Sequence, residues 1–312
     1  MFLHFTSRAR LVAIAVGLSV VTLVGAALAQ FDGGREGRGR RGGRGRDGGG
    51  GFNRSDEERA GVPLWENEKG FEKDVFTFVR VIYGEDGYGG DWGGGGRRGR
   101  GMRGGRWSTD YPFSDYNFSF RLQQLTSLKV NPNALQLSLT DERLFDYPFI
   151  YMIEPGNLFF TDEEVVALRK YLLAGGFLMV DDFWGDYQYQ NFYEQIKRVF
   201  PDREPNELPL EHEIFNIVYR LKEKPQTPSI NSALEGKPWG ITWEEQHGGD
   251  CRTVHYKGIF DDKGRMMVII CHNTDLGDGW EREGEDPWYF TEFAEKKAYP
   301  MGINIVVYAM TH

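Results

Sequence analysis

Two adjacent carboxylates, Asp181 and Asp182, stand directly after a short run of apolar residues at 177–180. Acids at the end of a buried strand can act as a nucleophile, as a general base or as ligands for a hard cation. They can equally be the polar end of the strand, because Asp is also a good cap for a following helix. Neighbouring side chains on a strand point to opposite faces, so only one of the two acids can cap. Asp181 and Asp182 are the candidate catalytic residues.

Further polar and aromatic residues follow the other predicted strands. Because the carboxyl ends of parallel strands meet at one edge of a sheet, these side chains are expected to lie together around a crevice. His212 lies in an irregular segment and would reach the crevice only as a loop residue. The aromatic residues indicate either a stacking surface for sugars or peptides, or loops held against the core. The candidate ligand-binding residues are Trp107, Asp110, Tyr111, Glu154, Trp184, His212, Asn273 and Asp275.

Several familiar site patterns are missing from the sequence. It has no HxH, HExxH or CxxC spacing, so no metal ligands are assigned and a zinc site is not expected. It also has no GxSxG elbow and no phosphate-binding GxxxxGK[ST] loop, and it indicates no particular cofactor. Cys271 and His272 are neighbours on a predicted strand, so they point apart and cannot pair as thiolate and base. Cys251 and Cys271 are expected to be buried thiols or, as an open alternative, one disulfide.

Apolar strands that alternate with amphipathic helices indicate the fold class. Thr161 and Glu164 form a capping box before one helix, and two glycines end it. The strands are short and apolar throughout, as strands buried between two helix layers are. The expected strands are 74–84, 134–139, 148–156, 177–182, 251–260 and 264–275, and the expected helices are 114–131, 161–176, 190–202 and 290–312. The pattern predicts an α/β three-layer sandwich with a mostly parallel, flavodoxin-like central sheet.

The first residues have the pattern of an export signal. Arg8 and Arg10 precede a charge-free run at 11–29, which ends in Ala-Leu-Ala. A basic start, an apolar centre and small residues at the end are typical of a cleaved secretory signal, here 1–29. An uncleaved anchor is the alternative, because such a run can just span a hydrocarbon core of roughly 30 Å. The domain is therefore expected outside the cytoplasm, periplasmic or secreted, and membrane-anchored if the signal is not cleaved.

Glycine and arginine dominate two further segments. Residues 30–69 have too few apolar residues to form a core and are predicted to be a disordered linker. A second Gly/Arg-rich segment, 84–106, follows the first predicted strand and is expected to be a loop. The remainder of 70–312 is predicted to form a single α/β domain.

Charge is distributed unevenly along the chain. The net charge is −9, but the export signal and the segments 31–59 and 84–106 carry +2 each, which leaves about −15 on the rest. An acidic domain repels polyanions, so nucleic acid is not expected as a partner. The basic Gly/Arg segments could contact anionic envelope polymers or lipid, or could be solvated linkers only.

Seven blocks of sequence, in order along the chain, carry a resemblance to a known family. The blocks are FTFVRVIY, WSTDYPFSDYNFSFRLQQLT, YPFIYM, LRKYLLAGGFLMVDDFWG, LPLEHEIF, HNTDLGDGW and GINIVVYAMTH. Over about 71–312 the chain resembles the bacterial family of domains of unknown function numbered 4159. The resemblance implies a fold similar to class I glutamine amidotransferase-like domains, with no established activity. In true amidotransferases the turn after such a GGFLMV strand carries a cysteine nucleophile, whereas Asp182 stands in the matching turn here.

Together these features predict an exported, non-catalytic module that binds a small molecule, a glycan or an envelope protein in the crevice. The alternative is a hydrolase that uses Asp181 or Asp182, with or without a divalent cation. That alternative requires both acids to converge around a cavity with Asp110, His212 or Asp275.

Overall fold

The computed structural model describes residue 59 and residues 61–70, 74–85, 105–245 and 248–312. The predicted export signal, most of the predicted linker and most of the Gly/Arg-rich loop lie outside the described residues. No helix within the described ranges is long and apolar enough to cross a membrane.

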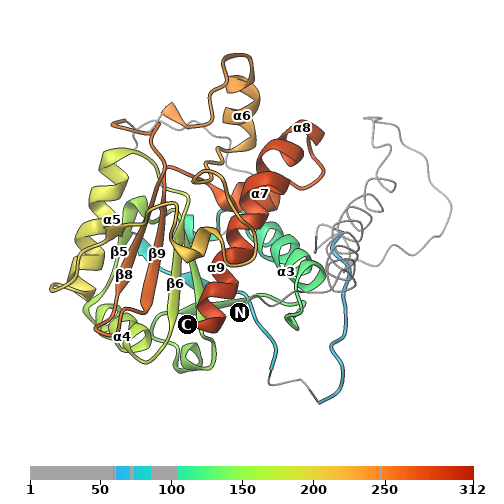
Figure 1. The fold of residues 1–312 in the computed structure, drawn as a ribbon. Helices are drawn as coiled ribbons and strands as arrows, with labels where there is room; N and C mark the ends of the chain where they lie inside the picture. Colours follow the sequence, from blue (N-terminus) through green and yellow to red (C-terminus); the bar gives the residue numbers. More distant parts are fainter. Residues whose placement is uncertain (1–58, 60, 71–73, 86–104, 246–247) are drawn as a thin grey trace, which may run out of the picture. The chain divides into compact units, whose positions relative to one another are not determined.

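A seven-stranded sheet forms the centre of the domain, in the order β3-β1-β4-β6-β9-β8-β7 (Figure 1). The strands from β3 to β9 run parallel to one another, whereas β8 is antiparallel to both of its neighbours. The strands are β1 (Val79–Ile82), β3 (Leu135–Ser138), β4 (Phe149–Ile153), β6 (Phe177–Asp181), β7 (Asn206–Glu207), β8 (His255–Phe260) and β9 (Met266–His272). A separate antiparallel ladder joins β2 (Gly84–Glu85) to β5 (Leu158–Phe159).

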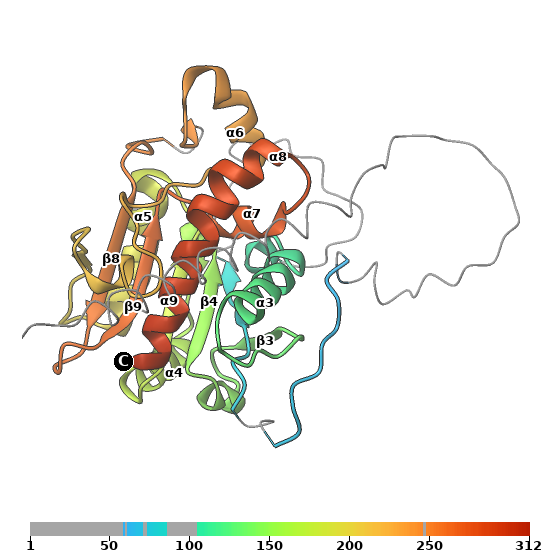
Figure 2. The ribbon, with the colours of Figure 1, turned by 45° about the vertical axis from the view of Figure 1, so that its right-hand side comes forward.

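Helices cover both faces of this sheet (Figures 1 and 2). The face-covering helices are α3 (Phe113–Leu125), α4 (Asp162–Leu173), α5 (Gly185–Val199), α7 (Leu276–Glu281) and α9 (Tyr299–Thr311). Between the last two lie the short α8 (Pro287–Tyr289) and a π-helical segment, η7 (Phe290–Ala298). The predicted α/β three-layer sandwich with a mostly parallel central sheet is confirmed.

The helices α4 and α5 bury one face of the sheet. Leu168 and Leu172 on α4 are four residues apart and therefore lie on one side of the helix, as do Phe192 and Ile196 on α5. All four side chains are buried in one cluster with strand residues such as Val180. The predicted capping box at the start of α4 is present, with both of its hydrogen bonds.

The helices α3, α7 and α9 bury the opposite face. Phe118 on α3 lies with its ring centroid 5.6 Å from that of Phe78, which in turn lies 5.2 Å from Tyr151 on β4. Trp280 of α7 and Ile303 of α9 belong to the same buried cluster. Aromatic packing of this density fixes α7 against the sheet, and α7 carries much of the polar chemistry described below.

Several element boundaries differ from the predictions. Helix α5 begins at Gly185 rather than at the predicted 190. The prediction missed its first turns because they are mostly exposed and have no apolar residues at helical spacing. Helix α3 ends at Leu125 rather than at 131, because Thr126 is extended and its hydroxyl donates to the Leu122 carbonyl at 2.7 Å. Strand β8 begins at His255 rather than at 251. Individual hydrogen bonds and solvent exposure set these ends. The spacing of apolar residues along the sequence indicates neither.

The segment predicted to be irregular, 203–250, contains short elements. Helix α6 (Ile230–Gly236) is capped by Ser229, whose hydroxyl accepts from the Ser232 N–H. The 3₁₀ turns η4 (Glu213–Phe215) and η5 (Lys237–Trp239) lie before and after it. Both cysteines, Cys251 and Cys271, are free and buried, so the alternative of a disulfide is not realised.

The carboxyl ends of β1, β4, β6 and β9 lie at one edge of the sheet. From β1 the chain passes to β3 on one side, whereas from β4 it passes to β6 on the other, so the strand order reverses between β1 and β4. Open α/β sheets bind ligands at such a switch point. Four non-glycine residues have positive φ in the described chain, and all follow strands at this edge: Asp110 (60°), Glu154 (47°), Asp182 (57°) and Asn273 (60°). A left-handed backbone strains residues that carry a Cβ, so strain is concentrated at this edge.

Candidate functional site

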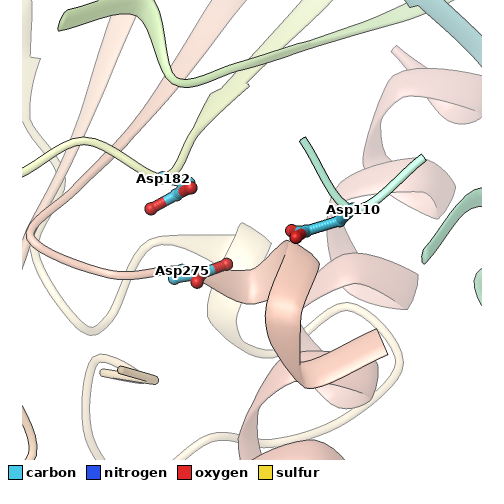
Figure 3. Close-up of side chains that lie close together, drawn as sticks. All are labelled: Asp110, Asp182 and Asp275. Atoms are coloured by element: carbon cyan, nitrogen blue, oxygen red, sulfur yellow. The ribbon is translucent and has the colours of Figure 1, made fainter. Parts of the chain in front are cut away.

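Three acids that are far apart in the sequence meet at the carboxyl edge: Asp110, Asp182 and Asp275 (Figure 3). Each offers one carboxylate oxygen, and these atoms lie within 4.8 Å of one another. All three acid side chains are buried, and the partial exposure of Asp182 as a residue is that of its backbone turn. We call these three residues the acidic triad.

Asp182 owes its position to the end of β6. Its φ of 57° turns the chain sharply between the strand and α5. The turn is held by the Asp182 N–H, which donates to the Thr274 carbonyl at 3.2 Å. The indole Nε1 of Trp184 donates to Asp182 Oδ1 at 3.2 Å. The carboxyl group is thus fixed by both the backbone and a buried tryptophan.

Asp275 is fixed at the start of α7. Its Oδ1 accepts the N–H of Asp278 at 2.7 Å, which makes it the N-cap of this helix. Its own N–H donates to the Thr227 carbonyl at 2.7 Å. A capping carboxylate keeps one oxygen in the cap while the second remains free to bind elsewhere.

Asp110 is positioned by a buried arginine on β1. The guanidinium of Arg80 donates to the carbonyls of Trp107 at 3.1 Å and Thr109 at 2.9 Å, and to the hydroxyl of Ser114 at 2.8 Å. These bonds anchor both sides of Asp110. An arginine with five donors can hold an irregular segment in a way that no apolar side chain can.

A glycine on α7 leaves room for Asp110. A Cβ at Gly277 would lie 2.8 Å from Asp110 Oδ2 and 2.9 Å from the hydroxyl of Tyr151, closer than real Cβ contacts come. Asp110 Oδ2 is buried, and no group in the described chain donates a hydrogen bond to it. A buried carboxylate oxygen without a donor is costly unless something else binds it.

Asp181 makes different contacts from its neighbour Asp182. Its Oδ2 accepts the N–H groups of Leu276 and Gly277 at 3.0 Å each, and the hydroxyl of Tyr151 at 3.1 Å. Burial raises the pKa of Asp181 to about 7, although these hydrogen bonds oppose the rise. Asp181 therefore holds the first turn of α7, and of the adjacent pair only Asp182 belongs to the triad.

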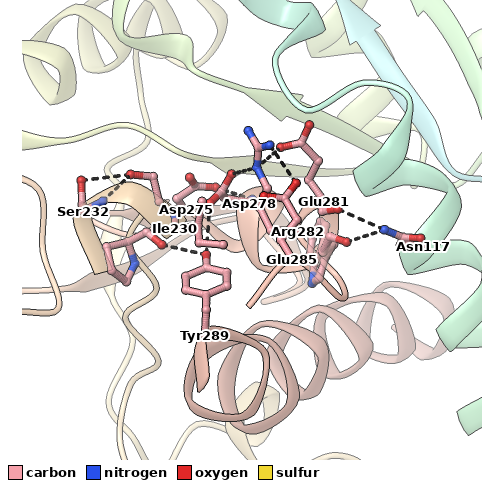
Figure 4. A network of polar contacts seen from close by, with 12 residues as sticks. Asn117, Ile230, Ser232, Asp275, Asp278, Glu281, Arg282, Glu285 and Tyr289 are labelled. Atoms are coloured by element: carbon pink, nitrogen blue, oxygen red, sulfur yellow. Dashed lines mark hydrogen bonds and ion pairs between the residues drawn. The ribbon is translucent and has the colours of Figure 1, made fainter. Parts of the chain in front are cut away.

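A second group of acids shares Asp110 with the triad: Asp110, Asp278 and Glu281. Here the protein itself provides a cation, the guanidinium of Arg282. Its Nε lies 3.0 Å from Asp278 Oδ1 and 2.6 Å from Glu281 Oε2 (Figure 4). Asp278 Oδ2 also accepts the hydroxyl of Tyr289 at 3.2 Å. In this second group a guanidinium thus pairs with two of the three acids, Asp278 and Glu281.

The triad differs because no lysine or arginine among the described residues forms an ion pair with it. Burial raises the pKa of Asp110, Asp182 and Asp275 well above the usual range, and neighbouring carboxylates raise each pKa further. Three carboxyl groups so close together cannot all ionise unless a cation joins them. The ligand atoms are all oxygens, which suits Ca²⁺ or Mg²⁺ and does not suit zinc in a structural site.

Residues 77–310 match the model of a protein family described as Domain of unknown function (DUF4159). The chain belongs to this family. A search of curated proteins finds no match. Every acid of the triad lies within the matched part of this DUF4159 domain, so the site belongs to the family domain rather than to the N-terminal extension.

Glu154 lies next to the triad without joining it. Its carboxylate pairs with Arg106 at 2.6 Å and accepts the hydroxyl of Thr109 at 2.9 Å. Its charge contributes to the raised pKa of Asp110 and of Asp182, which places it close to both. In the DUF4159 domain Glu154 therefore helps to hold the segment that carries Asp110.

Two other predicted residues support the site rather than line it. The Asn273 side chain accepts the N–H of Gly185 at 2.8 Å and donates to the carbonyls of Asp250 at 2.8 Å and Thr253 at 2.7 Å. These bonds join the turn after β9 to the start of α5 and to the loop before β8. Trp184 is buried, and it reaches the triad only through its bond to Asp182.

Trp107 and Tyr111 flank Asp110 on its own segment. Trp107 is half-buried against the core beneath α4 and α5, and Tyr111 is half-buried with its ring centroid 5.9 Å from the Arg80 guanidinium carbon. Both lie on the segment that carries Asp110, and within the described chain neither makes a polar contact to the triad.

His212 lies at the other end of the sheet. Its ring accepts the N–H of Ile214 at 3.2 Å, and its centroid lies 6.0 Å from that of Tyr308. Tyr308 packs on Phe177, the first residue of β6, which marks the amino edge. The structure therefore brings Asp110, Asp182 and Asp275 together and leaves His212 apart from them.

The sequence did contain a signal for two residues that our prediction overlooked. Arg80 interrupts the apolar run of the first strand, and a buried charge must be paired. Asp278 follows Asp275 at the i+3 spacing that puts both on the first turn of α7. Asp278 in turn predicts its partner Arg282, which follows it at the i+4 spacing of a helical ion pair. Glu281 had no such signal, because its place beside Asp110 depends on another part of the chain.

Proposed function

We propose that the DUF4159 domain binds a hard divalent cation through Asp110, Asp182 and Asp275, and through it a ligand in the crevice at the carboxyl edge. One observation carries the proposal: three carboxylate oxygens lie within 4.8 Å of one another, and no described lysine or arginine pairs with them. The domain is in this view a ligand-binding module and not an enzyme.

Electrostatics supports the proposal. Two like charges a few ångströms apart in a poorly solvated site repel strongly, so an acidic triad without a cation must take up protons. The neighbouring group with Asp278 and Glu281 shows how this fold relieves the same repulsion, by placing Arg282 between the acids. A divalent cation would do for the triad what Arg282 does for the second group.

The hydrolase alternative has less support. It required Asp181 and Asp182 to converge with a further group, but Asp181 is hydrogen-bonded to the first turn of α7 and His212 lies at the opposite edge. A nucleophilic or basic Asp182 would also need a second group of suitable pKa that is not itself a cation ligand.

Thermal unfolding of the whole chain with Ca²⁺, Mg²⁺ or Mn²⁺ tests the proposal. A cation that binds only the folded state at 100 times its Kd stabilises it by about 2.7 kcal/mol, which raises the melting temperature. Asp182→Asn should abolish this rise, whereas Asp146→Asn, at an exposed acid on another face, should preserve it. The proposal fails if no cation raises the melting temperature of the wild type, or if Asp182→Asn responds as the wild type does.

We further propose that this domain is exported. The charge-free run at 11–29 after two arginines supports a secretory signal, and the Gly/Arg composition supports contact with anionic envelope polymers or lipid. Sequencing the N-terminus of the mature protein from the source cell would decide between cleavage and an anchor. An amidotransferase-like fold also remains a proposal, supported by the strand–turn–helix that carries Asp182.

A further inference from the structure

We propose that the segment between β7 and α6 forms a second binding site, for a small organic anion in which one carboxylate is joined to a short apolar group. The site is a cavity of about 470 Å³, a size typical of small-molecule sites. No residue of the acidic triad lines it, so this inference goes beyond the proposed function and does not depend on it. The cavity is lined by Leu210, Glu211, Asn216, Arg220, Leu221 and Lys222.

Two cationic side chains in the lining have no partner in the described chain. Arg220 and Lys222 are exposed, and neither side chain forms an ion pair, a hydrogen bond or a ring contact with another described residue. Every other described arginine makes such a contact; Arg169 and Arg203, for example, pair with Asp202 at 3.6 and 4.0 Å. A free guanidinium suits a carboxylate, because it can donate two parallel hydrogen bonds to the two carboxylate oxygens.

Glu211 limits the charge of the anion that can bind. It lines the same cavity and, like the two cations, forms no ion pair with another described residue. Two positive charges and one negative charge give the lining a net charge of +1. A single carboxylate would neutralise this charge, whereas a dianion such as phosphate would be repelled by Glu211.

Two leucines provide apolar surface for the rest of the ligand. Leu210 and Leu221 are half-buried, and both pack against the core cluster that contains Phe215 and Ile303. Because both also line the cavity, part of their surface faces the space that the ligand would fill. An apolar group there would be removed from water together with this surface, which favours binding in proportion to the area covered.

A fully buried amide on α9 fixes the chain next to Arg220. Asn304 Oδ1 accepts the N–H groups of Val218 at 3.2 Å and Tyr219 at 2.8 Å, and its Nδ2 donates to the Tyr219 carbonyl at 2.8 Å. A buried amide is costly unless its hydrogen bonds are made, and here both of its ends bind one short stretch of backbone. The wall that carries Arg220 is therefore formed before any ligand binds, as is usual for small-molecule sites.

A second amide joins the two halves of the lining. Asn216 Nδ2 donates to the carbonyls of Leu210 at 3.3 Å and His212 at 3.2 Å. The N–H of Leu221 donates to the Phe215 carbonyl at 2.8 Å. The apolar and the charged parts of the lining are thus held in one frame, although the segment has little regular secondary structure.

Calorimetric titration of the whole chain with hexanoate tests the inference. The comparison probes are hexanamide, which is uncharged, hexylammonium, which has the opposite charge, and inorganic phosphate. We expect hexanoate to bind at least about tenfold more tightly than hexanamide, because only the carboxylate can form charge-assisted hydrogen bonds with the lining. Butanoate and acetate should bind progressively more weakly, by about two- to fourfold for each methylene that is missing.

Substitutions of the two cations locate the site. Arg220→Gln should lower the affinity for hexanoate at least about tenfold, and Lys222→Gln about threefold, because each removes one charge from the lining. Lys263→Gln is the matched control, at another exposed lysine without an ion pair in the described chain, and should change nothing. The side chain of Arg220 has no described partner to lose, so Arg220→Gln should melt at the temperature of the wild type.

The outcomes test this inference separately from the proposed function. The inference is wrong if hexanoate does not bind, or if hexanamide, hexylammonium or phosphate binds as tightly. Unchanged hexanoate affinity in both Arg220→Gln and Lys222→Gln also overturns it. Asp182→Asn should bind hexanoate as the wild type does while losing its response to the cation, so either proposal can fail without the other.

Discussion

The guanidinium of Arg80 and the carboxylate of Asp115 form an ion pair in which neither side chain is exposed to solvent. Arg80 Nη2 lies 2.5 Å from Asp115 Oδ1, and Nε donates to both carboxylate oxygens at 3.1 and 3.0 Å. This pair ties α3 to β1. Because the same guanidinium also holds the Trp107 and Thr109 carbonyls just before Asp110, the pair connects the core of the domain to its acidic triad.

Replacement of Arg80 by leucine should therefore destabilise the fold strongly. It leaves the Asp115 carboxylate buried without a partner, which typically lowers the free energy of unfolding by about 3–5 kcal/mol. Urea denaturation followed by circular dichroism would measure this. Arg143→Gln breaks the exposed pair with Asp141 and should change stability little. Equal losses in the two variants would contradict the assigned importance of burial.

Asp181 and Asp182 should respond differently to substitution. Asp181→Ala removes the acceptor of the Leu276 and Gly277 N–H groups and should lower the free energy of unfolding by roughly 3 kcal/mol. Its folded fraction should still be stabilised by the cation, because Asp181 is not in the triad. In Asp182→Asn the fold should persist and the cation response should be lost. Thermal scans of both variants with and without Ca²⁺ would show the two effects, and the reverse pattern would refute the division of roles.

Gly277→Ala should disturb the triad through Asp110. The new Cβ would lie 2.8 Å from Asp110 Oδ2, so either the acid or the start of α7 must move. We expect cation affinity to fall at least about tenfold, the equivalent of 1.4 kcal/mol. Gly84→Ala is the matched control, since its Cβ would make only an ordinary contact of 3.5 Å with the Phe159 carbonyl. Unchanged cation affinity in Gly277→Ala, measured by calorimetry, would argue against Asp110 as a ligand.

The sequence was sufficient to predict the sheet and the edge at which the acids gather. Asp182 and Asp275 each follow an apolar strand, and strands of a parallel sheet end together, so their meeting follows from topology. Asp110 was placed there only because its segment follows the first strand. The Thr161–Glu164 capping box was also predictable, because its two hydrogen bonds join residues three apart.

What the sequence could not show are the contacts between distant segments. That Asp181 binds the N–H groups of α7, 95 and 96 residues further on, depends on how α7 packs. The position of Glu281 beside Asp110 in the second acidic group is likewise set by the fold and not by spacing. His212 was expected near the crevice because nothing in an irregular segment indicates which edge of a sheet it covers.

His272 makes the stability of the domain depend on pH, independently of the triad. The residue is 4% exposed, and its Nε2 lies 3.1 Å from the Gly185 carbonyl. Burial, which opposes a charged ring, lowers the pKa of His272 to about 4. In the unfolded chain the pKa returns to about 6.5, so protonation favours the unfolded state.

The contribution of His272 to stability is therefore complete above pH 6.5 and is lost as the pH falls towards 4. The difference between these pKa values corresponds to about 3 kcal/mol. His272→Gln can still donate to the Gly185 carbonyl but does not titrate, so the wild type should lose stability relative to this variant across that range. The buried acids titrate in both proteins. Because their pKa values are raised, their contribution to the free energy of unfolding changes with pH in the opposite direction. This contribution cancels in the difference between the wild type and the variant. Urea denaturation of both at several pH values would measure it, and parallel profiles would refute the assignment.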